Sequence, residues 1–127
     1  MTDLDNRQKI DKAVGRFYEQ LIQDQQIGHF FTRIIPLDLE VHLPVIVDFW
    51  ETTLLGSGSY KGNPMIKHLE LNKLSPIRKE HFDRWLALWE SSLRAEFSGP
   101  KCEEAINRAK QIAQLMDYKI SAKGGLI

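Results

Sequence analysis

The segment LDLEVHLPVIVDFWETTLL, residues 37–55, carries the clearest helical pattern in the sequence. Its large apolar residues recur every three or four positions, which predicts a long helix with one apolar side. Pro44 predicts an interruption near the start, because proline lacks the backbone N–H that a helix interior uses. His42 falls on the apolar side and is expected to point inward. The positions on that side are Leu39, His42, Leu43, Ile46, Phe49, Trp50, Thr53 and Leu54.

The same periodicity continues upstream. NRQKIDKAVGRFYEQLIQD, residues 6–24, predicts a helix with Tyr18 on its apolar side. HFFTRIIP, residues 29–36, is too short and too aromatic for an exposed loop. We expect it to form a packed corner that ends at Pro36.

Downstream, GSGSYKGNP, residues 56–64, has the glycines, serines and proline of a loop, and the short MIKHLEL follows. Ser75 and Pro76 predict the start of a helix that carries Trp85 and ends near Gly99. EEAINRAKQIAQLMDYKI, residues 103–120, predicts a last helix with small inner residues. The fold class predicted from periodicity is all-α.

Length and charge limit the function. The chain of 127 residues suits one domain over residues 1–127, with a disordered tail about 121–127. Basic and acidic residues balance at 17 each, which argues against nucleic acid or an anionic membrane as partner. No membrane span or signal peptide is recognisable, so a soluble, cytoplasmic protein is expected. Cys102 is the only cysteine and is interpreted as incidental.

Two of the four histidines stand out as candidates for chemistry. His29 and His81 lie in a turn and an early helical turn, where solvation or capping explains them. His42 and His68 fall on apolar sides, where each unpaired imidazole nitrogen would cost about 1–3 kcal/mol. Because this cost applies to both His42 and His68, it suggests that these residues bind a ligand.

Zinc is a poor choice because two histidines and one distant cysteine lack the spacing of a zinc site. A Ser-His-Asp hydrolase is disfavoured because the turn that would hold its serine is absent. A flat apolar cofactor such as haem fits better: one histidine would bond the iron and the other would face the open position. Tyr18 and Trp85 would then supply hydrogen-bond donors, although both also suit core aromatics with a polar end at the surface.

Five motifs in order give the chain a family resemblance: FYEQLI, GHFF, HLPVIVDFW, LLGSGSYKGNPMIKHL and HFDRWLALWE. Over residues from about Val14 to Tyr118 the sequence resembles the truncated haemoglobins, and most closely their group III. The resemblance implies a shortened globin fold, a two-over-two helical sandwich around haem b. The chain departs from the family pattern at Gln25, Gln26, His29 and Leu39.

The resemblance also implies roles for individual residues. His68 matches the proximal ligand of the haem iron, and His42 matches the distal-helix histidine, either as a gate or as a second iron ligand. Tyr18, Trp85 and Ile46 match the other residues of the distal pocket. The expected haem contacts are Phe31, Phe49, Lys67 and Arg78, the last two as candidates for the propionates.

The implied activity is reversible binding of O2, NO or CO. Two donors aimed at bound O2 favour tight retention, so sensing, scavenging or redox chemistry is expected rather than bulk transport. One alternative is a haem enzyme acting in NO dioxygenation or peroxidase-like chemistry with a separate reductase. The other is a haem-free helical interaction module.

Overall fold

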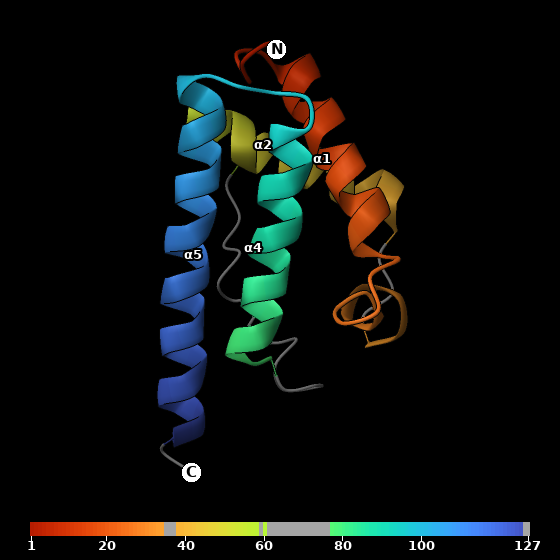
Figure 1. Ribbon diagram of the computed structural model, residues 1–127, viewed down its shortest axis with the longest axis vertical. Coiled ribbons are helices and arrows are strands. Elements are labelled where there is room, and N and C mark those ends of the chain that lie inside the picture. Colours follow the sequence, from red (N-terminus) through yellow and green to blue (C-terminus); the bar gives the residue numbers. More distant parts are fainter. Residues whose placement is uncertain (35–37, 59, 61–76, 126–127) are drawn as a thin grey trace.

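The computed structural model describes residues 1–34, 38–58, 60 and 77–125, with side chains of the last helix described to residue 119. These residues form α1 (Arg7–Leu21), the short π-helix η1 (Phe30–Ile34), α2 (Leu39–Leu55), α4 (Lys79–Arg94) and α5 (Pro100–Gly125) (Figure 1). No strand occurs in the described part of the chain, where only an isolated bridge pairs Thr2 with Phe97. The all-α prediction is confirmed.

The helices pack around one core. α1 lies against both α2 and α4, and α5 runs along α4 and also contacts α2 (Figure 1). Aromatic rings join three of these helices: Trp50 of α2 stacks on Trp89 of α4 at 4.9 Å between ring centroids, and Phe17 of α1 meets Trp89 at 5.0 Å. Such contacts fix the separation of α1, α2 and α4.

α1 forms as its sequence predicts. The Asn6 side chain caps its first turn by accepting a 2.9 Å hydrogen bond from the backbone N–H of Lys9. Its apolar positions repeat at helical spacing and turn toward the core. The buried residues are Ile10, Ala13, Val14, Phe17, Tyr18 and Leu21.

Pro44 does not interrupt α2, contrary to the sequence prediction. The helix runs through it without a break, starting after the cap residue Asp38. The missing N–H would have bonded to the carbonyl of Glu40, and both Glu40 and Pro44 are exposed. Water can therefore satisfy that carbonyl, which makes an early, solvent-facing proline tolerable.

The predicted bounds of the last two helices are also wrong. α4 begins at Lys79 instead of Pro76, because the backbone N–H of Arg78 turns out of the helix and donates to Nδ1 of His81 at 2.9 Å. α5 begins at Pro100, where the fixed φ of proline suits a first helical position. It continues to Gly125, and the expected disorder of the tail about 121–127 stays a prediction.

The start of α5 depends on the N-terminal segment. The Asp3 carboxylate accepts the backbone N–H groups of Lys101 at 3.0 Å and Cys102 at 2.8 Å. Burial opposes ionisation, but these hydrogen bonds prevail and lower the pKa of Asp3. Gly99 precedes the helix at φ +126°, a conformation that side chains rarely adopt. Cys102 is fully buried, which raises the pKa of its thiol.

Candidate functional site

Tyr18 and His42 meet between α1 and α2. The Tyr18 hydroxyl oxygen lies 3.2 Å from Nε2 of His42, and the two rings are nearly perpendicular at 5.4 Å between centroids. Tyr18 is only 7% exposed, and this burial raises the pKa of its phenol well above the ordinary value. The group therefore stays a neutral O–H at physiological pH, able to donate one hydrogen bond.

The tautomer of His42 decides where that donor points. If Nε2 is protonated, His42 donates to the Tyr18 oxygen, and the phenol O–H remains available to a third group. If Nε2 is unprotonated, the phenol donates to His42 instead. A ligand that needs a hydrogen-bond donor would select the first arrangement, so the pair can adapt to what binds beside it.

Phe31 and Trp85 approach the same region from two other elements. The Phe31 ring, on η1, lies 6.4 Å from Tyr18. Trp85, on α4, lies 6.2 Å from Phe17, whose ring is 5.4 Å from Tyr18. Trp85 is half-buried, and within the described residues no acceptor takes a hydrogen bond from its indole N–H. The structure thus brings Tyr18, His42 and Phe31 together, and Trp85 contacts Phe17, the neighbour of Tyr18 on α1.

A layer of half-buried apolar side chains accompanies these residues. Ile46 and Phe49 follow His42 on α2 by one and two turns and contact the core without being enclosed by it. Such surface is costly to leave partly in water and suits an apolar partner that would complete its burial. The half-buried apolar residues that pack on the core are Phe31, Ile34, Leu39, Leu43, Ile46, Phe49, Trp85, Leu86, Leu88 and Ile112.

Three of the predicted site residues, His68, Lys67 and Arg78, are not tested by the described structure. His68 and Lys67 lie outside the described residues. Arg78 is exposed at the start of α4, where its backbone makes the contact with His81. Their roles stay predictions.

Comparisons with known proteins bear on this arrangement. A family model described as bacterial-like globin matches residues 3–118. The chain is 33% identical over 123 residues to the group 3 truncated hemoglobin ctb of Campylobacter jejuni, covering 94% of each chain. The chain belongs to the group III truncated haemoglobins. It is also 32% identical over 75 residues, 58% of each chain, to the group 1 truncated hemoglobin GlbN of Synechocystis.

The fold of this truncated haemoglobin agrees with a solved relative. The crystal structure of the group III truncated hemoglobin from Campylobacter jejuni matches with a TM-score of 0.81 at 32% identity, covering 94% of this chain and 95% of that one. The predicted shortened globin fold is therefore confirmed.

Sequence reasoning missed the residue that organises the corner of this truncated haemoglobin. One oxygen of Asp24 accepts the backbone N–H groups of Gln26 and Ile27, both at 3.1 Å, and the other accepts Nε and Nη2 of Arg84 at 2.9 and 2.7 Å. The Arg84 guanidinium, followed by these backbone groups, lowers the pKa of Asp24 against the effect of burial. An aspartate that begins a turn ending in Gly28 is a signal for such a structure.

Gly28 shows how tight the corner is. A Cβ at this position would lie 2.5 Å from the carbonyl oxygen of Asp24 and 2.8 Å from that of Ile22. Only glycine fits there without moving the backbone. The tight turn thereby places Phe30 in the core and Phe31 against Tyr18.

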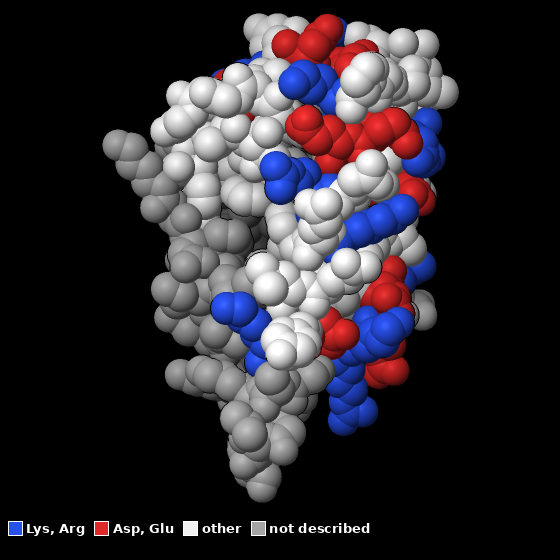
Figure 2. Space-filling model, turned by 90° about the vertical axis from the view of Figure 1, so that its left-hand side faces the viewer, with Lys and Arg blue, Asp and Glu red and all other residues white. Residues whose placement is uncertain are grey.

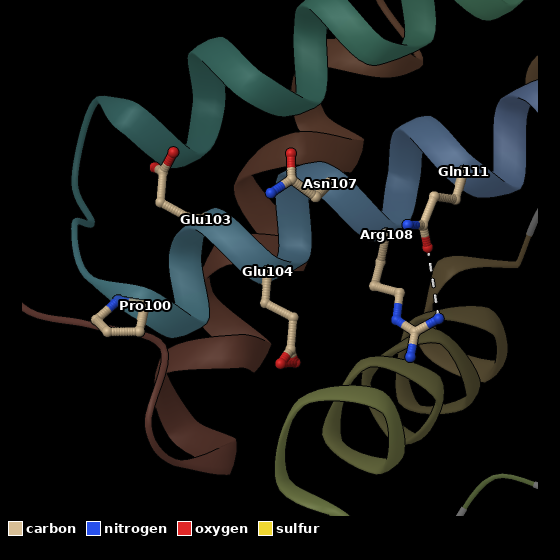
Figure 3. Close-up of a pocket in the computed structure, with 6 residues that line it drawn as sticks. All are labelled: Pro100, Glu103, Glu104, Asn107, Arg108 and Gln111. Carbon is tan, nitrogen blue, oxygen red and sulfur yellow. Dashed lines mark hydrogen bonds between the residues drawn. The ribbon is translucent and has the colours of Figure 1, made fainter.

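The outer face of α5 carries a separate surface hollow. Its volume is about 450 Å³, and its lining comes entirely from α5 (Figure 3). None of the predicted site residues takes part in it. The lining residues are Pro100, Glu103, Glu104, Asn107, Arg108 and Gln111. Figure 2 shows acidic and basic side chains interspersed on the right-hand part of one face, whereas the described side chains to their left are mostly uncharged. Across the described residues, no helix combines the length and apolarity that crossing a bilayer needs.

Proposed function

We propose that this truncated haemoglobin binds haem b and holds O2, NO or CO in a pocket whose polar groups are Tyr18, His42 and Trp85. The observation that carries the proposal is the 3.2 Å contact between Tyr18 and His42, two polar groups turned toward each other at the edge of an apolar core. Family membership supports the cofactor. Bound haem would supply an iron able to bind a diatomic gas.

The chain's own residues have separate tasks in this proposal. His68 would hold the iron from the proximal side, and Lys67 and Arg78 are the candidates for the propionates. Ile46, Phe49 and Phe31 would cover the faces of the ring with apolar surface. Their half-buried state fits this role, because a flat cofactor would complete their burial and exclude water from the gas.

Tyr18 and Trp85 would set how long a gas stays. The phenol is neutral, and the indole N–H has no acceptor among the described residues, so both can donate to a partly anionic oxygen. A hydrogen bond to a charged group contributes about 1.5–3 kcal/mol, and about 1.4 kcal/mol changes an equilibrium constant tenfold. Slow O2 release follows, which favours scavenging, sensing or redox chemistry over bulk transport.

Optical spectra of the ferric, ferrous and CO-bound protein test the proposal. The protein, expressed with haem supply, should show a Soret band that shifts when CO is added to the ferrous form. His68→Ala should lose the haem, whereas His29→Ala should retain it, because the His29 ring contacts Phe30 at the corner. Wild-type protein without a Soret band would contradict haem binding, and a His68→Ala variant with unchanged haem content would contradict the proximal assignment.

A further inference from the structure

The corner after α1 holds α4 at a point next to Trp85. Arg84 lies in the second turn of α4, one residue before Trp85, and donates two hydrogen bonds to a single carboxylate oxygen of Asp24. The second oxygen of Asp24 is bound to the backbone N–H groups of Gln26 and Ile27. The same carboxylate therefore stabilises the turn that follows α1, the helix of Tyr18, and binds α4, the helix of Trp85.

Two further contacts join the corner to the first turn of α4. The side-chain amide of Gln26 donates to the carbonyl of Glu80 at 3.4 Å. The Phe30 ring packs on the edge of His81 at 5.0 Å between centroids. Both act on the same few residues of α4. The ion pair is the link whose two hydrogen bonds, at 2.9 and 2.7 Å, are shorter than the Gln26 contact.

We propose that the Asp24–Arg84 pair is a positioning device for Trp85, holding its indole against Phe17 of α1, the neighbour of Tyr18. The part of the inference that concerns gas retention rests on the proposed function. Helix side chains end about 5–6 Å from the helix axis, so a rotation of α4 by about 10° would move the indole by about 1 Å. Polar groups in a binding site need placement to within about 0.5 Å, so this rotation would weaken a hydrogen bond from the indole.

The solvent exposure of the Asp24–Arg84 pair limits how much the pair contributes to the stability of the protein. The Asp24 side chain is 6% exposed, but that of Arg84 is 43% exposed. A half-exposed ion pair adds little to the free energy of unfolding. Asp24 also keeps its two backbone donors when Arg84 is replaced. We therefore expect Arg84→Gln to fold and to alter the position of α4 more than the stability of the protein.

A matched pair on the same helix provides the control. Arg94 of α4 binds Glu103 of α5 through two hydrogen bonds of 2.8 and 3.0 Å. The Arg94–Glu103 pair has the same charges as the Asp24–Arg84 pair and also joins two elements. It lies at the opposite end of α4 from the corner. Arg94→Gln therefore removes an ion pair of the same charges, although one whose carboxylate is more exposed, without loosening the corner.

Nuclear magnetic resonance of the indole N–H groups tests the positioning directly. In haem-loaded protein with 15N-labelled tryptophan, Trp85→Phe identifies the Trp85 cross-peak. Arg84→Gln should shift or broaden that peak, Asp24→Asn should act in the same direction, and Arg94→Gln should leave it in place. A Trp85 peak unmoved by Arg84→Gln, or moved equally by Arg94→Gln, would overturn the inference.

O2 dissociation by stopped flow tests the consequence for gas binding. Arg84→Gln should speed O2 release by about threefold to tenfold, as expected for partial loss of one charge-assisted hydrogen bond. In a Trp85→Phe background the same substitution should have no further effect. An equal effect in both backgrounds would show that Arg84 does not act through Trp85. If Trp85→Phe alone leaves release unchanged, the proposed donor role fails, and the indole spectra still decide whether the pair positions the ring.

Discussion

The hydroxyl of Tyr18 and Nε2 of His42 lie 3.2 Å apart, across the contact between α1 and α2. Nε2 is the imidazole atom at the far end of the ring, the one best placed to reach an iron. In this structure it is directed at the phenol. From this contact we propose that His42 acts as a gate held by Tyr18, with the role of a second iron ligand as the alternative.

Removing the Tyr18 hydroxyl should speed O2 release. Tyr18→Phe takes away one charge-assisted hydrogen bond of about 1.5–3 kcal/mol, so the dissociation rate should rise about tenfold or more. Stopped-flow displacement of O2 by CO measures this rate. Tyr118→Phe is the control, because Tyr118 is 72% exposed on α5. Equal rates in wild-type and Tyr18→Phe protein would contradict the donor role.

The ligand-free ferrous protein should be five-coordinate, because the Tyr18 contact directs Nε2 of His42 toward the phenol. His42→Ala should leave that spectrum unchanged and should alter the rate of CO association, since the gate is gone. Absorption spectroscopy and flash photolysis measure the two quantities. A six-coordinate low-spin spectrum that becomes five-coordinate in His42→Ala would instead establish His42 as an iron ligand.

Periodicity in the sequence predicted the helices and the sides of α1 and α2 on which Tyr18 and His42 lie. Tyr18 lies on the apolar side of α1, and His42 lies on the apolar side of α2. The side of the helix that each residue occupies could therefore be predicted from spacing alone. The contact between them could not be derived from spacing, because it depends on the angle at which α1 crosses α2. The haem hypothesis grouped Tyr18 with His42 and Trp85, and the family resemblance gave each of them a role.

Several features that the sequence did not predict depend on the packed molecule. The effect of Pro44 depends on the exposure of the carbonyl it leaves unpaired, and exposure is a property of the packed molecule. Asp3 caps a helix 98 residues further along the chain at Lys101. Asp24 and Arg84 are 60 residues apart. No local sequence pattern connects such pairs. The sequence therefore predicted a packed corner but not the ion pair between Asp24 and Arg84.

Acid should weaken the corner in a way that depends on Asp24. Its pKa is lowered in the folded protein, chiefly by Arg84, below the unfolded value of about 3.9. The stabilisation from ionised Asp24 is therefore present above about pH 4 and is lost as the pH falls through the lower, folded pKa. Urea denaturation at several pH values should show a steeper acid loss of unfolding free energy in wild type than in Asp24→Asn. Parallel curves would contradict a lowered pKa.

Two glycines should respond to alanine in opposite directions. Gly99 sits at φ +126°, and a Cβ there would lie 2.6 Å from Cγ of Asp3, the side chain that caps α5. Gly99→Ala combines a disfavoured backbone with displacement of that cap, so it should lower the free energy of unfolding by at least about 1–3 kcal/mol.

Gly15 lies within α1, and a Cβ there meets no atom within 4 Å. Gly15→Ala should raise the free energy of unfolding by about 0.5–1 kcal/mol, because alanine loses less backbone entropy in a helix. Urea denaturation of both variants and wild type, in the same state of haem loading, measures the difference. The midpoints should move in opposite directions with unchanged slopes. A Gly99→Ala midpoint equal to that of wild type would mean that Asp3 and the start of α5 can rearrange freely, contrary to the capping described above.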